Sequence, residues 1–244
     1  MKESLMSRFG NARELSKRHA NRETWESNMG ITPWGIYNSG LAGYNSEFSE
    51  VLGCPIPEFL AGRQSKTNAV FVMDAMGTGG YFEEITADGY LAVSLSDSRT
   101  QDRVLSDKKN NRKLIAGDIM QGNTSRKIRE FLAANGAPGF DLITGRALGG
   151  WRSFRLAYDQ NHPMEYLILN QLFQLLNPDH GVLVIDPDIQ LTCDSAKLWK
   201  KIVNESTFAK IYPEDSLGAF KITKNGNEKL PRLLKIPNAQ MQTE

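Results

Sequence analysis

A glycine-rich turn follows directly on a short apolar run. The run ends at Asp74, and residues 75–80 read Ala-Met-Gly-Thr-Gly-Gly. Glycines between a strand and a helix let the backbone approach a ligand closely, and their amide groups attract an anion such as a phosphate or a carboxylate. The alternative interpretation is a tight turn that binds nothing, and the turn alone does not decide between the two.

Two more carboxylates stand after the next two apolar runs. Asp97, preceded by Ser96, comes 97 − 74 = 23 positions after Asp74. A carboxylate about 20 residues beyond a glycine turn can accept hydrogen bonds from both hydroxyls of a ribose, although Ser96 or Asp97 would also begin a helix well. Asp118, beside Ile119, ends the third run and can accept a hydrogen bond from an adenine amino group.

Short apolar runs alternate with longer amphipathic segments from residue 69 onward. The runs do not alternate internally, which is typical of strands buried on both faces of a parallel sheet. They cover 69–73, 90–95, 113–116, 140–144 and 182–185, and the helix candidates cover 79–87, 98–107, 123–135, 162–176 and 194–205. This order predicts a doubly wound α/β fold.

Two more strand candidates follow, at 208–212 and 219–223. The linker between them is short and rich in turn-forming residues, so it can join antiparallel strands but cannot make a parallel crossover. The sequence therefore predicts a mostly parallel seven-stranded sheet that ends in an antiparallel hairpin.

Residues 1–68 are more polar and are interrupted by glycine and proline. Apolar residues at helical spacing predict an amphipathic helix over 3–20. Glycines and prolines between positions 33 and 57 predict that no long element forms there. We therefore expect two units: a helical and loop extension over 1–68, which can act as a lid, and a Rossmann-like cofactor-binding domain over 69–244.

Taken in order, these features resemble the motifs of class I (Rossmann-like) S-adenosylmethionine-dependent methyltransferases over about residues 69–223. The segment 175–181, Leu-Leu-Asn-Pro-Asp-His-Gly, is similar to that family's segment before the fifth strand, and the hairpin would be its reversed last strand. The resemblance implies S-adenosylmethionine as the cofactor. It implies that the methionine part is held by Asp74, Gly77 and Gly79, the ribose by Asp97 or Ser96, and the adenine by Asp118 with Ile119 beside the ring. Met76, Thr78 and Thr144 complete the predicted set of cofactor contacts.

The glycine loop departs from the family's pattern. Met76 stands where the usual loop has a glycine, and the Gly-Thr-Gly that follows sits one residue closer to Asp74 than usual. This departure leaves open a non-catalytic or degenerate Rossmann-like binding protein, or a partner subunit. A nicotinamide-dependent oxidoreductase is disfavoured, because the chain has no Tyr-x-x-x-Lys and because the terminal hairpin suits methyltransferases better.

A sulfonium methyl group is already activated, so its transfer needs alignment and exclusion of water rather than a metal or a covalent nucleophile. Tyr158 and His162 follow the fourth run, and a histidine's near-neutral intrinsic pKa suits it to take a proton from a hydroxyl acceptor. The alternative is that His162 is only an exposed residue at a helix start.

Four residues are candidates for lining a substrate pocket: Arg146, Trp151, Trp34 and Tyr37. Trp34 and Tyr37, together with Tyr44, could form a lid over cofactor and substrate, although packing in a small core is the more common role for aromatic residues. We expect a small-molecule acceptor, methylated on a hydroxyl or carboxylate oxygen, and no metal.

Composition narrows the class of protein. The chain has 244 residues. Its two cysteines argue against a disulfide framework, and its net charge of +1 argues against a global electrostatic field that attracts nucleic acid. The basic helix predicted over 3–20 could contact nucleic acid or an acidic partner. The alternative is a solvated helix face, which the absence of a wider basic surface favours. The sequence has neither a secretory signal nor the run of about 20 apolar residues that crosses a bilayer, so we expect a cytoplasmic protein without a membrane partner.

Overall fold

The computed structural model describes residues 40–94, 97, 99–119, 121–146, 164–186, 194–214 and 218–231. They contain a seven-stranded sheet in the order β3-β2-β1-β4-β5-β7-β6. The strands are β1 Phe71–Asp74, β2 Gly89–Ser94, β3 Arg112–Ala116, β4 Leu142–Arg146, β5 Val182–Asp186, β6 Ala209–Tyr212 and β7 Phe220–Lys224. Strands β1 to β5 are parallel, and β7 runs antiparallel to both of its neighbours. The predicted mostly parallel sheet with an antiparallel C-terminal hairpin is therefore confirmed.

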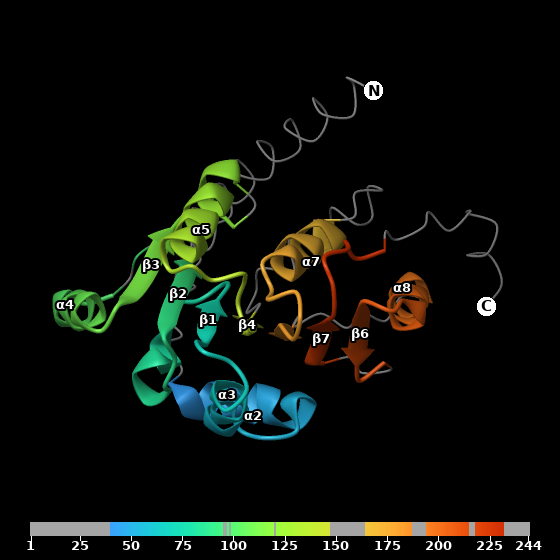
Figure 1. Ribbon diagram of the computed structural model, residues 1–244, viewed down its shortest axis with the longest axis horizontal. Coiled ribbons are helices and arrows are strands. Elements are labelled where there is room, and N and C mark those ends of the chain that lie inside the picture. Colours follow the sequence, from blue (N-terminus) through green and yellow to red (C-terminus); the bar gives the residue numbers. More distant parts are fainter. Residues whose placement is uncertain are drawn as a thin grey trace, which may run out of the picture.

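Helices cover both faces of this sheet. They are α2 Leu41–Leu52, α3 Ile56–Gln64, the 3-10 helix η1 Gly80–Glu84, α4 Gln101–Lys109, α5 Gly122–Ala134, α7 Met164–Gln174 and α8 Asp194–Glu205. Figure 1 shows α5 and α7 on one face and α2 and α3 on the other, with α4 beside β3 at one edge and α8 beside β6 at the opposite edge. Layers of helices on both faces agree with the predicted doubly wound arrangement.

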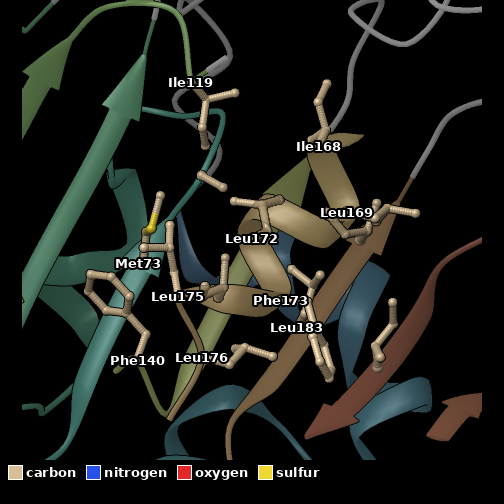
Figure 2. Close-up of a cluster of buried hydrophobic side chains, with 14 of the residues drawn as sticks. Met73, Ile119, Phe140, Ile168, Leu169, Leu172, Phe173, Leu175, Leu176 and Leu183 are labelled. Carbon is tan, nitrogen blue, oxygen red and sulfur yellow. The ribbon is translucent and has the colours of Figure 1, made fainter. Parts of the chain in front are cut away.

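Each face of the sheet has its own apolar core. Successive strand residues point to opposite faces, so Met73 packs under α5 and α7 whereas Val72 packs against α2 and α3. Figure 2 shows the first core, in which Leu172 and Phe173 of α7 lie near Leu183 of β5. Burial on both faces is the physical reason that β1, β2, β4 and β5 are apolar without alternation. The run predicted over 113–116 differs, because it forms the edge strand β3, in which Lys113 and Ala116 are exposed.

Helix α2 corrects one prediction, because it is continuous over 12 residues where glycines predicted no long element. Its residues Tyr44, Phe48, Val51 and Leu52 are buried in the core that covers this face of the sheet. A glycine inside a helix costs only about 1 kcal/mol, which the burial of four large side chains outweighs. The helix ends where Gly53 adopts a left-handed conformation, φ 86°.

A second correction concerns the segment predicted as a helix over 79–87. It forms only the five-residue 3-10 helix η1, and β2 begins soon after, at Gly89. Gly79 has φ 68° and so interrupts helical geometry at the start of this segment. The predicted helix over 3–20 lies outside the described residues. Within the described part of the chain, no helix combines the length and apolar character needed to span a membrane.

Candidate functional site

Asp74, the last residue of β1, is fully buried. Its Oδ2 accepts hydrogen bonds from the Tyr44 hydroxyl at 2.8 Å and from the Gly79 amide at 2.9 Å. Burial raises the pKa of Asp74 to about 6, although both of these hydrogen bonds favour the charged form and act in the opposite direction. Among the residues that the structure describes, Oδ1 has no hydrogen-bond partner. The carboxylate therefore faces the inside of the turn and holds the turn together.

The glycines of the turn are required by packing within the chain. A Cβ on Gly77 would lie 2.2 Å from Oδ2 of Asp74, and one on Gly79 would lie 2.4 Å from the Phe82 ring. Thr78, between them, is buried. The glycine loop, residues 75–80, thus needs Gly77 and Gly79 whether or not it binds a ligand, so the presence of these two glycines does not distinguish the two interpretations of the sequence.

Met76 lies over the end of β4. It is partly buried and packs against the core that contains α5 and α7. Its methyl carbon lies 3.6 Å from the place that a Cβ on Gly145 would occupy. The residue that departs from the family's pattern is therefore accommodated by the glycine opposite it on β4.

Thr144 pairs in register with Asp74 on the neighbouring strand and is fully buried. Its Oγ1 lies 2.9 Å from the hydroxyl of Tyr81. The ring of Tyr81 lies against that of Tyr44, with 4.2 Å between ring centroids. Thr144, a predicted cofactor contact, is thus bonded to Tyr81 of η1, and Tyr81 in turn packs against Tyr44 of α2.

Arg146, a candidate substrate contact at the end of β4, is held by α2. It forms an ion pair with Glu47, and its guanidinium lies 5.3 Å from the centroid of the Tyr44 ring. Both side chains of the pair are mostly buried, at 14% and 21% exposed. In this arrangement Arg146 attaches α2 to the strand end.

Asp97, the predicted ribose ligand, is bound by Arg99. The Arg99 side chain donates from Nε to Oδ1 at 2.8 Å and from Nη2 to Oδ2 at 2.7 Å, which lowers the pKa of Asp97. Arg99 also bonds Asp107 on α4, and Arg103 on the same helix donates to the carbonyl of Gly79 at 2.7 Å. Arg99, which precedes α4, and Arg103 of α4 both bond Asp107, and they thus connect the acidic residue after β2 with the glycine loop.

Asp118 and Ile119, the predicted adenine contacts, lie just beyond β3. Asp118 is partly exposed and Ile119 is buried. The amide side chain of Gln171 on α7 donates to the carbonyl of Ile119 and to the hydroxyl of Ser125. This helix therefore fixes the backbone beside Asp118, leaving a carboxylate and an apolar side chain next to each other.

The predicted site residues within the described ranges lie at or just after the carboxyl ends of the adjacent parallel strands β3, β2, β1 and β4. They therefore all lie at the same end of these strands. Ser96, Trp34, Tyr37, Trp151, Tyr158 and His162 lie outside the described residues and remain predictions. Sequence reasoning missed the roles of Tyr44 and Glu47, because their partners lie 30 and 99 positions away. The local sequence indicated only that Tyr44 is an aromatic residue in a polar segment and therefore a candidate for burial.

Metal-ligating side chains do not cluster in the part of the chain that the structure describes: it holds no group of three or more His, Cys, Asp or Glu suited to a metal ion. Compared with models of known protein families and with curated proteins, the chain matches none.

Proposed function

We propose that the chain is an S-adenosylmethionine-dependent methyltransferase that acts on a hydroxyl or carboxylate of a small molecule. The observation that carries this proposal is that three carboxylates lie at the carboxyl ends of three adjacent parallel strands. They are Asp74 with its glycine loop at the end of β1, Asp97 after β2 and Asp118 after β3. Ligands of open parallel α/β sheets bind at these strand ends. The reversed strand β7, which lies next to β5, agrees with the resemblance.

The residues present fit the adenosyl end of the cofactor best. The partly exposed carboxylate of Asp118 can accept from the adenine amino group, and Ile119 beside it is packed into the apolar core with 8% of its surface exposed. Asp97 can accept from the ribose hydroxyls once it exchanges its bonds to Arg99. The backbone of residues 76–78 would hold the methionine end.

The bound cofactor would supply a methyl group that is already activated by the sulfonium. The task left to this chain is alignment of the acceptor and exclusion of water. The internal hydrogen bonds of Asp74 hold the glycine loop in one conformation, and such preorganisation lowers the cost of binding. Proton removal from the acceptor is assigned to His162 or Tyr158, both outside the described residues.

Isothermal titration of the full chain with S-adenosylhomocysteine tests the proposal. We expect binding to the wild type and binding about tenfold weaker to Asp118→Ala, since a hydrogen bond to a charged group contributes about 1.5 kcal/mol or more. Asp179→Ala is the matched control, because Asp179 is an exposed aspartate in the loop that precedes β5, at the amino end of the strands. Lack of binding to the wild type would rule out the proposed cofactor.

A second candidate is a non-catalytic or degenerate Rossmann-like protein that acts as a partner subunit. One observation favours it: the Arg99 side chain occupies both carboxylate oxygens of Asp97. A thermal-shift panel of S-adenosylmethionine, NAD and NADP separates the candidates. A ligand at 100 times its Kd stabilises the folded state by about 2.7 kcal/mol, so a response to none of the three favours the partner subunit and a response to NAD or NADP favours an oxidoreductase.

A further inference from the structure

A buried cluster of polar side chains joins α2 to the ends of β1 and β4. The cluster, which we call the tip cluster, consists of Tyr44, Glu47, Asp74, Tyr81, Thr144 and Arg146. Asp74, Tyr81 and Thr144 are fully buried, and Tyr44 is 4% exposed. Buried polar groups that lose their partners cost about 1–3 kcal/mol each, so these side chains hold one another in a specific arrangement.

A single oxygen lies at the centre of this cluster. Oδ2 of Asp74 accepts from the Tyr44 hydroxyl at 2.8 Å and from the Gly79 amide at 2.9 Å. The same oxygen would be 2.2 Å from a Cβ on Gly77. The glycine loop is therefore folded closely around a carboxylate whose other contact is α2.

Several independent contacts fix the position of Tyr44. Its ring centroid lies 4.2 Å from that of Tyr81 and 5.3 Å from the guanidinium of Arg146. Arg146 in turn pairs with Glu47, which lies one helical turn after Tyr44 on α2. The first amide of the helix, that of Leu41, donates to Glu84 of η1 at 2.7 Å. Any displacement of α2 must consequently move the Tyr44 hydroxyl or break its bond to Asp74.

We propose that Tyr44 is a positioning residue for the glycine loop, acting through Asp74. Helix α2 then belongs to the scaffold of the cofactor site, and movement of this helix changes the conformation of the loop. The effect on the loop is a property of the contacts above. The effect of Tyr44 on cofactor affinity rests on the proposed function.

The variant Tyr44→Phe tests the loop, because it removes the hydroxyl and keeps the packed ring. Tyr90→Phe is the matched control: Tyr90 is also buried, and its hydroxyl bonds the backbone of Ile85 and Ala87 instead of Asp74. Hydrogen exchange of the Gly79 amide, followed by NMR, is expected to be about tenfold faster in Tyr44→Phe and unchanged in Tyr90→Phe. Equal exchange in wild type and Tyr44→Phe, or equal acceleration in both variants, would overturn the positioning role.

A titration of the Asp74 carboxyl resonance gives a readout that a merely structural role would not move. The Tyr44 hydroxyl favours the charged carboxylate, so its removal is expected to shift the titration midpoint of Asp74 to higher pH, and Tyr90→Phe is expected to leave it in place. An unshifted midpoint in Tyr44→Phe would contradict the proposal.

Affinity for S-adenosylhomocysteine, measured by calorimetry on the same proteins, connects the loop to the proposed function. We expect about tenfold weaker binding to Tyr44→Phe than to Tyr90→Phe. If the wild type binds no S-adenosylhomocysteine, the proposed function fails while the exchange and titration results still decide the role of Tyr44. If wild type and Tyr44→Phe bind equally well, the loop is not positioned by Tyr44 for this ligand.

Discussion

The guanidinium of Arg99 binds both carboxylate oxygens of Asp97, at 2.8 Å from Nε and 2.7 Å from Nη2. Asp97 follows β2 at the position where a ribose ligand is expected, so the ion pair and a ribose would compete for the same two oxygens. The pair is partly exposed, with Asp97 37% exposed and Arg99 10% exposed.

Removing Arg99 should therefore tighten binding of S-adenosylhomocysteine. Partly exposed ion pairs are worth up to about 1 kcal/mol, so Arg99→Ala is expected to raise the affinity by at most about fivefold in calorimetry. Arg126→Ala is the control, since Arg126 pairs only with exposed groups on α5. Weaker binding to Arg99→Ala would show that Arg99 serves the ligand rather than competing with it.

The free energy of unfolding should depend on pH through the protonation of Asp74. Its pKa is raised from 3.8 to about 6 in the folded state, so folding favours the protonated carboxyl. The contribution of Asp74 is therefore complete below pH 3.8 and is lost as the pH rises through 6, by at most about 3 kcal/mol at about 1.4 kcal/mol per pKa unit. Urea unfolding at pH 5 and pH 7.5 checks this against Asp74→Asn. The wild type should gain stability relative to the variant at the lower pH, and the opposite trend would contradict the buried carboxylate.

Gly77→Ala should destabilise the fold, because its Cβ would lie 2.2 Å from Oδ2 of Asp74. Relief of this overlap must displace the carboxylate or the loop, at a cost of about 1–3 kcal/mol in the free energy of unfolding. Gly62→Ala is the control, because the exposed Gly62 lies in α3 and has nothing within 4 Å of an added Cβ. That control should be neutral or stabilise by up to about 1 kcal/mol. If Gly77→Ala is as stable as Gly62→Ala, the loop is not packed on Asp74.

Asp141 should affect stability without affecting the ligand. It is fully buried at the amino end of β4, where it accepts from the Phe71 amide at 2.7 Å and lies 2.6 Å from Nε2 of His180. Asp141→Ala leaves these partners unmatched and is expected to cost about 3 kcal/mol. Since the proposed site lies at the other end of the strands, calorimetry on the folded variant should show unchanged affinity for S-adenosylhomocysteine. Weaker binding would place part of the site at this end.

The positions of the strands and the reversed hairpin follow from the sequence alone. Runs such as Val70–Met73 are apolar at every position, which is typical of a strand buried between two layers of helices. The linker after Tyr212 is too short for a parallel crossover, so the last two strands must be antiparallel. These signals are local, so they can be read without knowledge of the fold. They also bring Asp74, Asp97 and Asp118 to one edge of the sheet.

Tertiary structure alone decided the partners of those residues and the order of the sheet. No periodicity encodes that β7 lies beside β5, that Tyr44 reaches Asp74, or that Arg146 binds Glu47 across 99 positions. Glycines in the segment before Gly53 predicted a broken chain, yet burial of Phe48 and its neighbours against the sheet made α2 a helix. Contacts between distant segments depend on which surfaces the folded layers bring together, and a local sequence pattern contains no information on that.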